Sequence, residues 1–373
     1  MKNPALADVS AAVVARDKPA QYGPLEHSQS SAGHAFPCTI ADHRVTELLG
    51  FETVPEVENI LLQVLFRPIA DLTSNPGKRI RAQLVSFSYR LLNGDRAMSA
   101  AMIDRYRSCA EAIELIHAGS LIIDDIEDGS AVRRGRAALH KQYGTPLALN
   151  AGNWLYFWPA ALLKDGALSE DDLLLIYKHY HQTMLRAHFG QALDLGTRVD
   201  TLAQHSVIEV CLASMRLKTG ALMGFAALLG AALADASETL LSALNDFGRD
   251  LGVSLQMFDD LGNVIGKCEP SKRYEDLMLS RPSWVWACAA QNSSRTEYEK
   301  FVAAARKLPE AADLERWMEE TGLVRQTRQS ARTHLDRTFE NLKARLNAEQ
   351  IRWSNQAFDE LYALGEKLAV AYG

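Results

Sequence analysis

A helical repeat of apolar residues, which starts at about residue 43 and continues almost to the end of the chain, constrains the fold more than any other feature. Apolar side chains recur at helical spacing in 54–71 until the Ser-Asn-Pro-Gly cluster at 74–77, and again in 79–92 until Asn93-Gly94. Further helical segments are expected at about 96–127, 147–164, 169–194, 202–233, 237–265 and 295–370. Convincing period-two alternation, the mark of a half-buried strand, is absent. The pattern therefore predicts an all-α fold, a single large helical bundle with a central cavity.

The chain divides into two parts of different composition. Residues 1–42 are rich in Ser, Gly, Pro, Ala and His and show no sustained period, so we expect a mobile N-terminal extension. Its apolar stretch at 11–15 lies between Asp8 and Asp17, which suits neither a secretory signal nor a transit peptide. Residues 43–373 are expected to form the helical domain.

Charge and composition limit the partners and the location. A formal net charge of −6 gives no basic surface for nucleic acid. The longest apolar run, 220–234, has 15 residues and is shorter than the about 20 that span a bilayer, so it predicts a buried helix and no membrane span. The cysteines are widely spaced and form no C-x-x-C pair, which favours a reducing cytoplasm. They are Cys38, Cys109, Cys211, Cys268 and Cys288.

An acidic cluster ends the apolar run Leu121–Ile123. On a helix, Asp124 and Asp128 lie one turn apart on the same face, with Asp125 beside them. On an outer surface such carboxylates would simply be solvated. At the end of a buried helix they are costly unless a cation compensates them. Mg²⁺ binds through a few carboxylate oxygens together with waters and substrate phosphates, which such a cluster can provide.

A second cluster places polar residues along one stripe of an otherwise apolar helix. Gln256, Asp259, Asp260 and Asn263 follow one another at i, i+3, i+4 and i+7, where a core helix would carry Leu or Val. If the two clusters face each other across the bundle, they can hold several metal ions around one diphosphate.

Basic residues complement the acidic clusters. Lys78 and Arg81 lie at i, i+3 at a helix start, where backbone N–H groups also favour anions. Arg133-Arg134 follows the first cluster, and Lys218 precedes the long apolar run. A diphosphate ester needs guanidinium groups and metal ions to neutralise its charge, although each of these residues alone could be an ordinary surface charge.

These motifs resemble those of the trans-isoprenyl diphosphate synthases, the polyprenyl synthetase family, and within it the eukaryotic type of geranylgeranyl diphosphate synthase. The resemblance covers roughly residues 55–345. Its densest part is Asp124-Asp125-Ile-Glu127-Asp128, Arg133-Arg134-Gly135, His140, Tyr143-Gly144, Asn150 and Asn153-Trp154-Leu-Tyr156-Phe157. Gly190-Gln191-Ala-Leu-Asp194, Lys218-Thr219-Gly220 and Gln256-x-x-Asp259-Asp260 follow in the family's order.

The resemblance implies a role for each matching residue. The metal ligands would be Asp124, Asp125, Asp128, Asp259 and Asp260, which act in catalysis together with Lys218 and Gln256. The allylic diphosphate would be bound by Arg133, Lys218, Gln256 and Lys272, and isopentenyl diphosphate by Lys78, Arg81, His117 and Arg134. The cofactor would be Mg²⁺, in several ions per site and replaceable by Mn²⁺. The family also implies the isoprenoid synthase fold, isoprenoid diphosphate substrates and a homodimer.

Near the second cluster the sequence departs from the pattern of the family that it resembles. Asn263 stands where many members have a third aspartate, although the eukaryotic geranylgeranyl type also has Asn there. The segment after Lys272 is one residue shorter than usual, and Arg281 replaces a familiar lysine before Pro282–Trp286. Arg and Lys are not equivalent at a phosphate contact, so these changes bear on substrate choice.

Three activities are compatible with these residues. The first is Mg²⁺-dependent head-to-tail condensation of an allylic diphosphate with isopentenyl diphosphate. The second is a class I terpene cyclase or a prenyltransferase with another acceptor, but a cyclase has no need for Lys78, Arg81 and His117. The third is a non-catalytic partner subunit, which would be expected to lose aspartates that this chain retains.

Small residues before the first cluster bear on product length. Gly119 and Ser120 lie about one turn before Asp124, where members that make short products often carry an aromatic, and the bulkier Ile116 lies one turn further down. A cavity open at the first level and narrower beneath predicts a product longer than C15, with C20 expected. The alternative is that Gly119 and Ser120 are small because two helices pack closely there.

Overall fold

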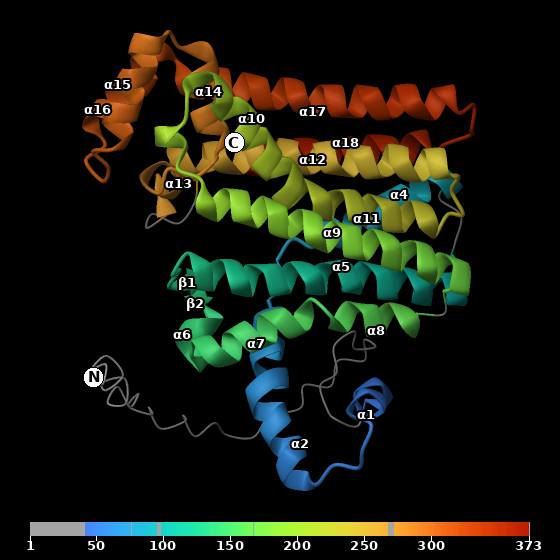
Figure 1. Ribbon diagram of the computed structural model, residues 1–373. Helices are drawn as coiled ribbons and strands as arrows, with labels where there is room; N and C mark the ends of the chain where they lie inside the picture. The colour runs from blue at the N-terminus through green and yellow to red at the C-terminus, as the bar shows by residue number, and fades with distance from the viewer. Residues whose placement is uncertain (1–41, 76, 95–97, 167, 268–271, 373) are drawn as a thin grey trace, which may run out of the picture. The chain divides into compact units, whose positions relative to one another are not determined.

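The computed structural model describes residues 42–75, 77–94, 98–166, 168–267 and 272–372. These residues are almost entirely helical (Figure 1), which confirms the all-α prediction. The expected extension lies, apart from Asp42, outside the described residues, as do Cys38 and Cys268. The other three cysteines are buried free thiols.

The first half of the described chain contains α1 His43–Leu49, α2 Pro55–Leu61, α3 Arg67–Thr73, α4 Ile80–Asn93, α5 Ala100–Glu127, α6 Leu139–Tyr143, α7 Thr145–Leu155, α8 Trp158–Lys164 and α9 Glu170–Gly196. The second half contains α10 Gln204–Met215, α11 Ala221–Ala232, α12 Glu238–Ile265, α13 Glu275–Met278, α14 Trp284–Asn292, α15 Arg295–Ala305, α16 Ala312–Thr321, α17 Leu323–Ala348 and α18 Asn355–Tyr372. Two π-helical turns, η1 Leu62–Phe66 and η3 Arg216–Gly220, and the 3₁₀ turn η2 Val199–Thr201 complete the set.

Several helices begin at serine caps. Ser99, Ser169, Ser237 and Ser294 precede α5, α9, α12 and α15, and each side chain accepts a hydrogen bond from the backbone N–H three residues later. Such caps satisfy amide groups that have no intrahelical partner. The helix starts are therefore encoded locally.

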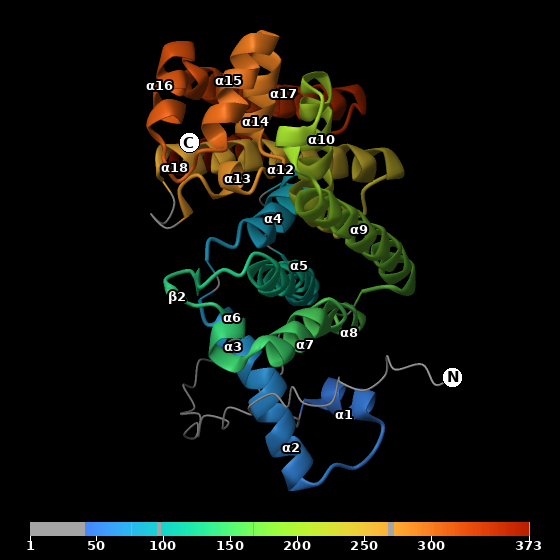
Figure 2. The ribbon, with the colours of Figure 1, turned by 60° about the vertical axis from the view of Figure 1, so that its left-hand side comes forward.

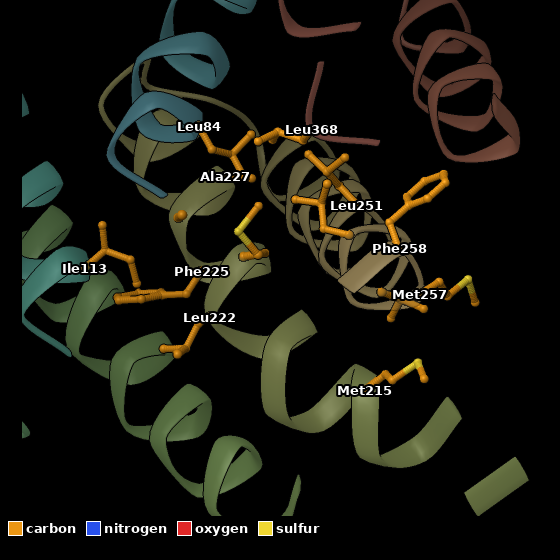
Figure 3. Close-up of a cluster of buried hydrophobic side chains, with 14 of the residues drawn as sticks. Leu84, Ile113, Met215, Leu222, Phe225, Ala227, Leu251, Met257, Phe258 and Leu368 are labelled. Atoms are coloured by element: carbon orange, nitrogen blue, oxygen red, sulfur yellow. The ribbon is translucent and has the colours of Figure 1, made fainter. Parts of the chain in front are cut away.

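Helix α11 is at the centre of the core. All twelve of its residues are buried, and it packs against α4, α5, α9 and α12. Figure 3 shows Leu222 and Phe225 of α11 among side chains from neighbouring helices, including Ile113 and Leu251. The prediction of a buried helix here is confirmed. By length and composition alone, Gln204–Ala232 could cross a membrane, and 67% of its most apolar window is buried inside the protein.

The region 295–370 contains four helices rather than one continuous pattern. Pro309 lies between α15 and α16 and separates them, because proline has no backbone N–H to donate within a helix. Gly322, at φ +67°, ends α16 in the left-handed conformation. Gln350, at φ +53°, lies between α17 and α18. A short α14, at 284–292, was not among the predicted segments.

A small hairpin follows the first acidic cluster. Strands β1 Val132–Arg133 and β2 Arg136–Ala137 pair antiparallel around Arg134-Gly135. Both turn residues have positive φ, +51° and +75°, as a two-residue hairpin turn requires. The turn thereby presents two neighbouring arginines from a rigid backbone.

Candidate active site

A single cavity of about 620 Å³ brings most of the predicted residues together. Its walls come from α4, α5, α9, η3 and α12 and from residues 272–283. Figure 2 shows α5 nearly end-on, with α4 above it and α7 below it. The predicted site residues that line it are Arg81, Ile116, His117, Ser120, Asp124, Asp128, Arg133, Arg134, Lys218, Gln256, Asp259, Asp260 and Lys272. Asp125, Gly119 and Lys78 do not line it.

Asp124 and Asp128 face the cavity in different electrostatic settings. Burial raises the pKa of Asp124, but the Lys218 ammonium at 3.0 Å and a hydrogen bond from Gln191 outweigh burial and lower the pKa. For Asp128, burial and repulsion from Asp124 raise the pKa to about 6, although Arg281 lies 2.6 Å away. The cluster is thus only partly neutralised by the protein's own cations.

Asp125 turns away from the cavity and holds an arginine. Its carboxylate is 3% exposed and accepts hydrogen bonds from Arg133, at 2.5 Å from Nη2 and 2.9 Å from Nε. In this arrangement Asp125 fixes Arg133, whose side chain does line the cavity. That Asp125 binds a metal ion stays a prediction.

Lys218 projects from the π-helical turn η3. Its Nζ lies 3.0 Å from Asp124 and 2.7 Å from Asp194. These two carboxylates raise the pKa of Lys218 although burial opposes them, so the side chain stays cationic. A Cβ at Gly190 would overlap the backbone nitrogen of Lys218, so this close approach of α9 to η3 requires glycine. π-Helical turns inside helices are frequent at functional sites.

The second cluster is held by a relay of hydrogen bonds. The Thr219 hydroxyl donates to Gln256 Oε1 at 2.8 Å, and Gln256 Nε2 donates to Asp260 at 2.8 Å. The backbone N–H of Trp284 donates to the other oxygen of Asp260 at 2.6 Å. Burial, followed by repulsion from Asp276, nevertheless raises the pKa of Asp260 well above its usual value. Asp259 is exposed towards the cavity.

The departures from the family pattern have local structural roles. Asn263 donates to the carbonyl of Lys272 at 2.7 Å and so ties residue 272 to α12. Arg281 lies between Asp128 and Asp194, at 2.6 and 3.7 Å. Together with the Trp284 amide, these contacts attach the segment 272–286 to both clusters.

The predicted isopentenyl diphosphate pocket is strongly cationic. Arg81, Arg134 and His117 line the cavity near one another. Burial lowers the pKa of His117 well below its usual value, and the neighbouring arginines reinforce this, so the imidazole is neutral at pH 7. Lys78 lies behind this group, with its Nζ 3.8 Å from the centre of the Tyr372 ring.

The residues predicted to control product length have different surroundings. Ser120 and Ile116 line the cavity. Gly119 instead packs against α7, where a Cβ would lie 2.9 Å from the carbonyl oxygen of Gly152. For Gly119, close packing of two helices therefore explains the small side chain, which was the alternative interpretation.

Several cavity residues were not assigned roles from the sequence. These are Glu127, Tyr156, His188, Gln191, Asp194, Glu275, Asp276, Arg281 and Tyr372. Asp194 belongs to the Gly190–Asp194 motif and could have been found from it. Asp276 is half-buried, and desolvation together with Asp194 and Asp259 raises its pKa to about 7. Tyr372 lies far from any motif, so only the fold reveals it.

The acidic groups suit a metal ion that arrives with its substrate. In the part of the chain that the structure describes, no three His, Cys, Asp or Glu side chains converge to hold a metal by themselves. Mg²⁺ usually binds through one or two carboxylates plus substrate phosphates. Carboxylates with raised pKa values are those that lack sufficient positive charge, and a cation would supply it. The residues present therefore fit Mg²⁺.

A larger hollow of about 950 Å³ lies elsewhere, among η2, α10, α14 and α15. It contains no predicted site residue. Its main polar groups are already paired, because Asp200 binds Arg198 and Arg306 at 3.2 and 2.9 Å. Gln204 likewise donates to the Ala290 carbonyl at 2.8 Å. This hollow lacks the uncompensated charge of the first cavity.

Two solved structures share the fold. A geranylgeranyl pyrophosphate synthetase from Pyrococcus horikoshii is similar with a TM-score of 0.69 and 22% identity, over 82% of this chain and 90% of that one. A geranylgeranyl pyrophosphate synthase from Corynebacterium glutamicum, solved with isoprenyl diphosphate and magnesium, has a TM-score of 0.70 and 22% identity, over 88% and 96%.

Curated relatives and a family profile give the identity. A geranylgeranyl pyrophosphate synthase of Eremothecium gossypii is 34% identical over 207 residues, 54% of this chain and 61% of that protein. A short chain isoprenyl diphosphate synthase of Methanothermobacter thermautotrophicus is 31% identical over 271 residues, 71% and 76%. The profile of the polyprenyl synthetase family matches residues 62–321. The chain therefore belongs to the polyprenyl synthetase family, a family of prenyltransferases.

Proposed function

We propose that the protein catalyses the Mg²⁺-dependent 1′-4 condensation of an allylic prenyl diphosphate with isopentenyl diphosphate. The products are a longer (E)-prenyl diphosphate and free diphosphate. The observation that carries this proposal is that two acidic clusters, on α5 and α12, line the same cavity as Arg81, Arg134 and His117, the residues predicted to bind the acceptor. One polyanion can lie between the acidic clusters with metal ions, and a second can lie in the cationic pocket. Incubation with both substrates and analysis of the products tests the proposal.

The donor side of the cavity would bind the allylic diphosphate. Asp124, Asp128 and Asp259 would hold Mg²⁺ here, and the metal supplies Lewis-acid stabilisation of a departing diphosphate. Lys218 and Lys272 line the same cavity and would add direct positive charge. Asp194 and Asp124 keep Lys218 cationic, so it can stabilise the leaving group without a change in protonation.

The bonds and protons of the condensation balance without a histidine acting as a general base. The allylic C–O bond breaks with both electrons going to the diphosphate, which leaves an allylic cation. The double bond of isopentenyl diphosphate attacks that cation and forms the new C–C bond. The proton lost from isopentenyl diphosphate passes to the released diphosphate. The role of the protein is to orient the two substrates and to keep water away from the cation.

We propose C20 as the main product. Ser120, about one turn before Asp124, and Ile116, one turn further along α5, both line the cavity. The small Ser120 would leave room for the growing chain, and the bulkier Ile116 would narrow the path beneath it. Several relatives, among them the one from Eremothecium gossypii, are named geranylgeranyl diphosphate synthases. A small residue near the diphosphate site and a bulky one further along the helix favour a product of intermediate chain length.

Ser120→Phe is expected to shorten the product, because the ring would fill the path of the growing chain. The measurement is chromatography of the dephosphorylated products from a folded, active variant. The control is Asp104→Phe, which adds the same ring at an exposed position of the same helix. A buried position such as Leu115 would not serve, because a ring there would disturb the core. Unchanged product length in Ser120→Phe would mean that the chain takes another route.

We further propose that the enzyme is a homodimer. Helix α9 exposes Leu174, Leu185, Phe189 and Leu195 along one side, and Phe157 beside α7 is 75% exposed. Exposed apolar side chains in such a stripe are typical of subunit contacts. Sedimentation should show a dimer, and Phe189→Asp should shift it towards monomer. A monomeric wild-type enzyme at micromolar concentration would contradict this proposal.

A further inference from the structure

The end of α18 reaches the cavity from a part of the chain far from any motif. Tyr372 lines the cavity together with Arg81 and Arg134. Its backbone packs on α12, since a Cβ at Gly262 would overlap the Tyr372 carbonyl oxygen. Lys267 Nζ also donates to the Val370 carbonyl at 2.9 Å. These two contacts fix the last turn of α18 beside the second acidic cluster.

The Tyr372 ring contacts Lys78, a residue that is predicted to bind the acceptor diphosphate but does not itself line the cavity. Lys78 Nζ lies 3.8 Å from the ring centre, within the range of a cation–π interaction. An ammonium group carries three donors, so a face resting on the ring leaves other N–H bonds free for a phosphate oxygen. The contact therefore restrains the flexible lysine without consuming its ability to bind an anion.

The same pocket contains a buried cation in need of an anion. Arg81 Nε is buried and has no hydrogen-bond partner among the residues that the structure describes. Burial lowers the pKa of Arg81, while the Glu114 and Tyr372 side chains oppose that effect. Tyr372 thus contacts Lys78 and lines the same cavity as Arg81.

We propose that Tyr372 is a positioning residue for the acceptor diphosphate, and that its ring holds Lys78 at the pocket where Arg81 and Arg134 bind the phosphates. This inference rests on the proposed function, because the acceptor is taken to be isopentenyl diphosphate. It assigns to α18 a share in substrate binding that no motif in the sequence indicates.

Two variants separate the ring from the rest of the side chain. Tyr372→Phe keeps the aromatic face and loses the hydroxyl, whereas Tyr372→Leu keeps apolar packing and loses the π system. We expect Tyr372→Leu to raise the KM for isopentenyl diphosphate roughly five- to thirtyfold, the range of a partly desolvated cation–π contact. The KM for the allylic substrate and kcat should stay near wild type, and Tyr372→Phe should behave like wild type. Val370→Ala, exposed on the same turn, is the control.

A double-mutant cycle tests whether the ring acts through Lys78. The affinity for isopentenyl diphosphate is measured by calorimetric titration without metal, so that the readout does not require turnover. Once Lys78→Ala is present, Tyr372→Leu should cost little more, because the partner of the ring is gone. Additive losses, a harmful Tyr372→Phe or a harmless Tyr372→Leu would each overturn the assignment. Failure of the wild type to bind isopentenyl diphosphate would instead refute the proposed function.

Discussion

Asp124→Asn is expected to lower kcat by at least about a hundredfold, the scale of losing one charged stabilising group at a reacting centre. Asp124 lies in the cavity, and its carboxylate contacts Lys218 at 3.0 Å. The amide is nearly the same size but carries no charge, so it cannot share a metal ion with a diphosphate. Lys218 keeps Asp194 as a partner at 2.7 Å, so the fold should survive. Steady-state kinetics and thermal unfolding of the same preparation provide the measurement.

Asp104→Asn is the matched control for this experiment. Asp104 lies on the same helix, its side chain is 67% exposed, and its ion pair with Arg107 is long at 3.7 Å. We expect wild-type kinetics from it. Asp259→Asn, on α12, should reproduce the loss, and excess chelator should abolish turnover until Mg²⁺ is added back. Full activity in chelator, or in Asp124→Asn, would contradict metal-bridged binding.

Arg81→Ala is expected to raise the KM for isopentenyl diphosphate much more than the KM for the allylic substrate. Arg81 lines the cavity together with Arg134 and His117. Loss of a charged hydrogen bond to phosphate costs roughly 1.5–3 kcal/mol, about ten- to a hundredfold in affinity. The measurement is a pair of saturation curves, one for each substrate at a fixed excess of the other.

A control for Arg81→Ala comes from the same helix. Arg90, also on α4, pairs with Glu360 at 2.7 Å and does not line the cavity. Arg90→Ala removes an equal charge and should leave both KM values unchanged. If Arg81→Ala left the isopentenyl diphosphate curve unchanged while the enzyme stayed active, the pocket would not bind this acceptor, and a prenyltransferase with another acceptor would be favoured.

The helices could be predicted because their signals are local. Serine caps and 3.6-residue periodicity specify α5, α9 and α12 without reference to the rest of the fold. The four-way division of 295–370 was missed since the apolar pattern continues on both sides of each break. Only Pro309, Gly322 and Gln350 mark those breaks, and single residues weigh little against a long period.

Those site residues that lie on one helix could be predicted, because their spacing in the sequence determines which side chains share a face. The i, i+4 relation of Asp124 and Asp128 brought both to the cavity, whereas Asp125, one position on, points to Arg133 instead. Contacts between distant segments could not be read in this way. Gly119 is small because of Gly152, and Tyr372 reaches the pocket because α18 folds back on α12.

The central claim is that one cavity joins two diphosphate substrates, and a single incubation tests it most directly. Purified protein is incubated with Mg²⁺, radiolabelled isopentenyl diphosphate and one allylic substrate, which is dimethylallyl, geranyl or farnesyl diphosphate in separate reactions. A further reaction contains farnesyl or geranylgeranyl diphosphate without isopentenyl diphosphate. We expect label in a linear prenyl diphosphate, mainly C20, formed only when both substrates and Mg²⁺ are present. A hydrocarbon or alcohol formed from the allylic diphosphate alone, or no product with any pair, would contradict the account.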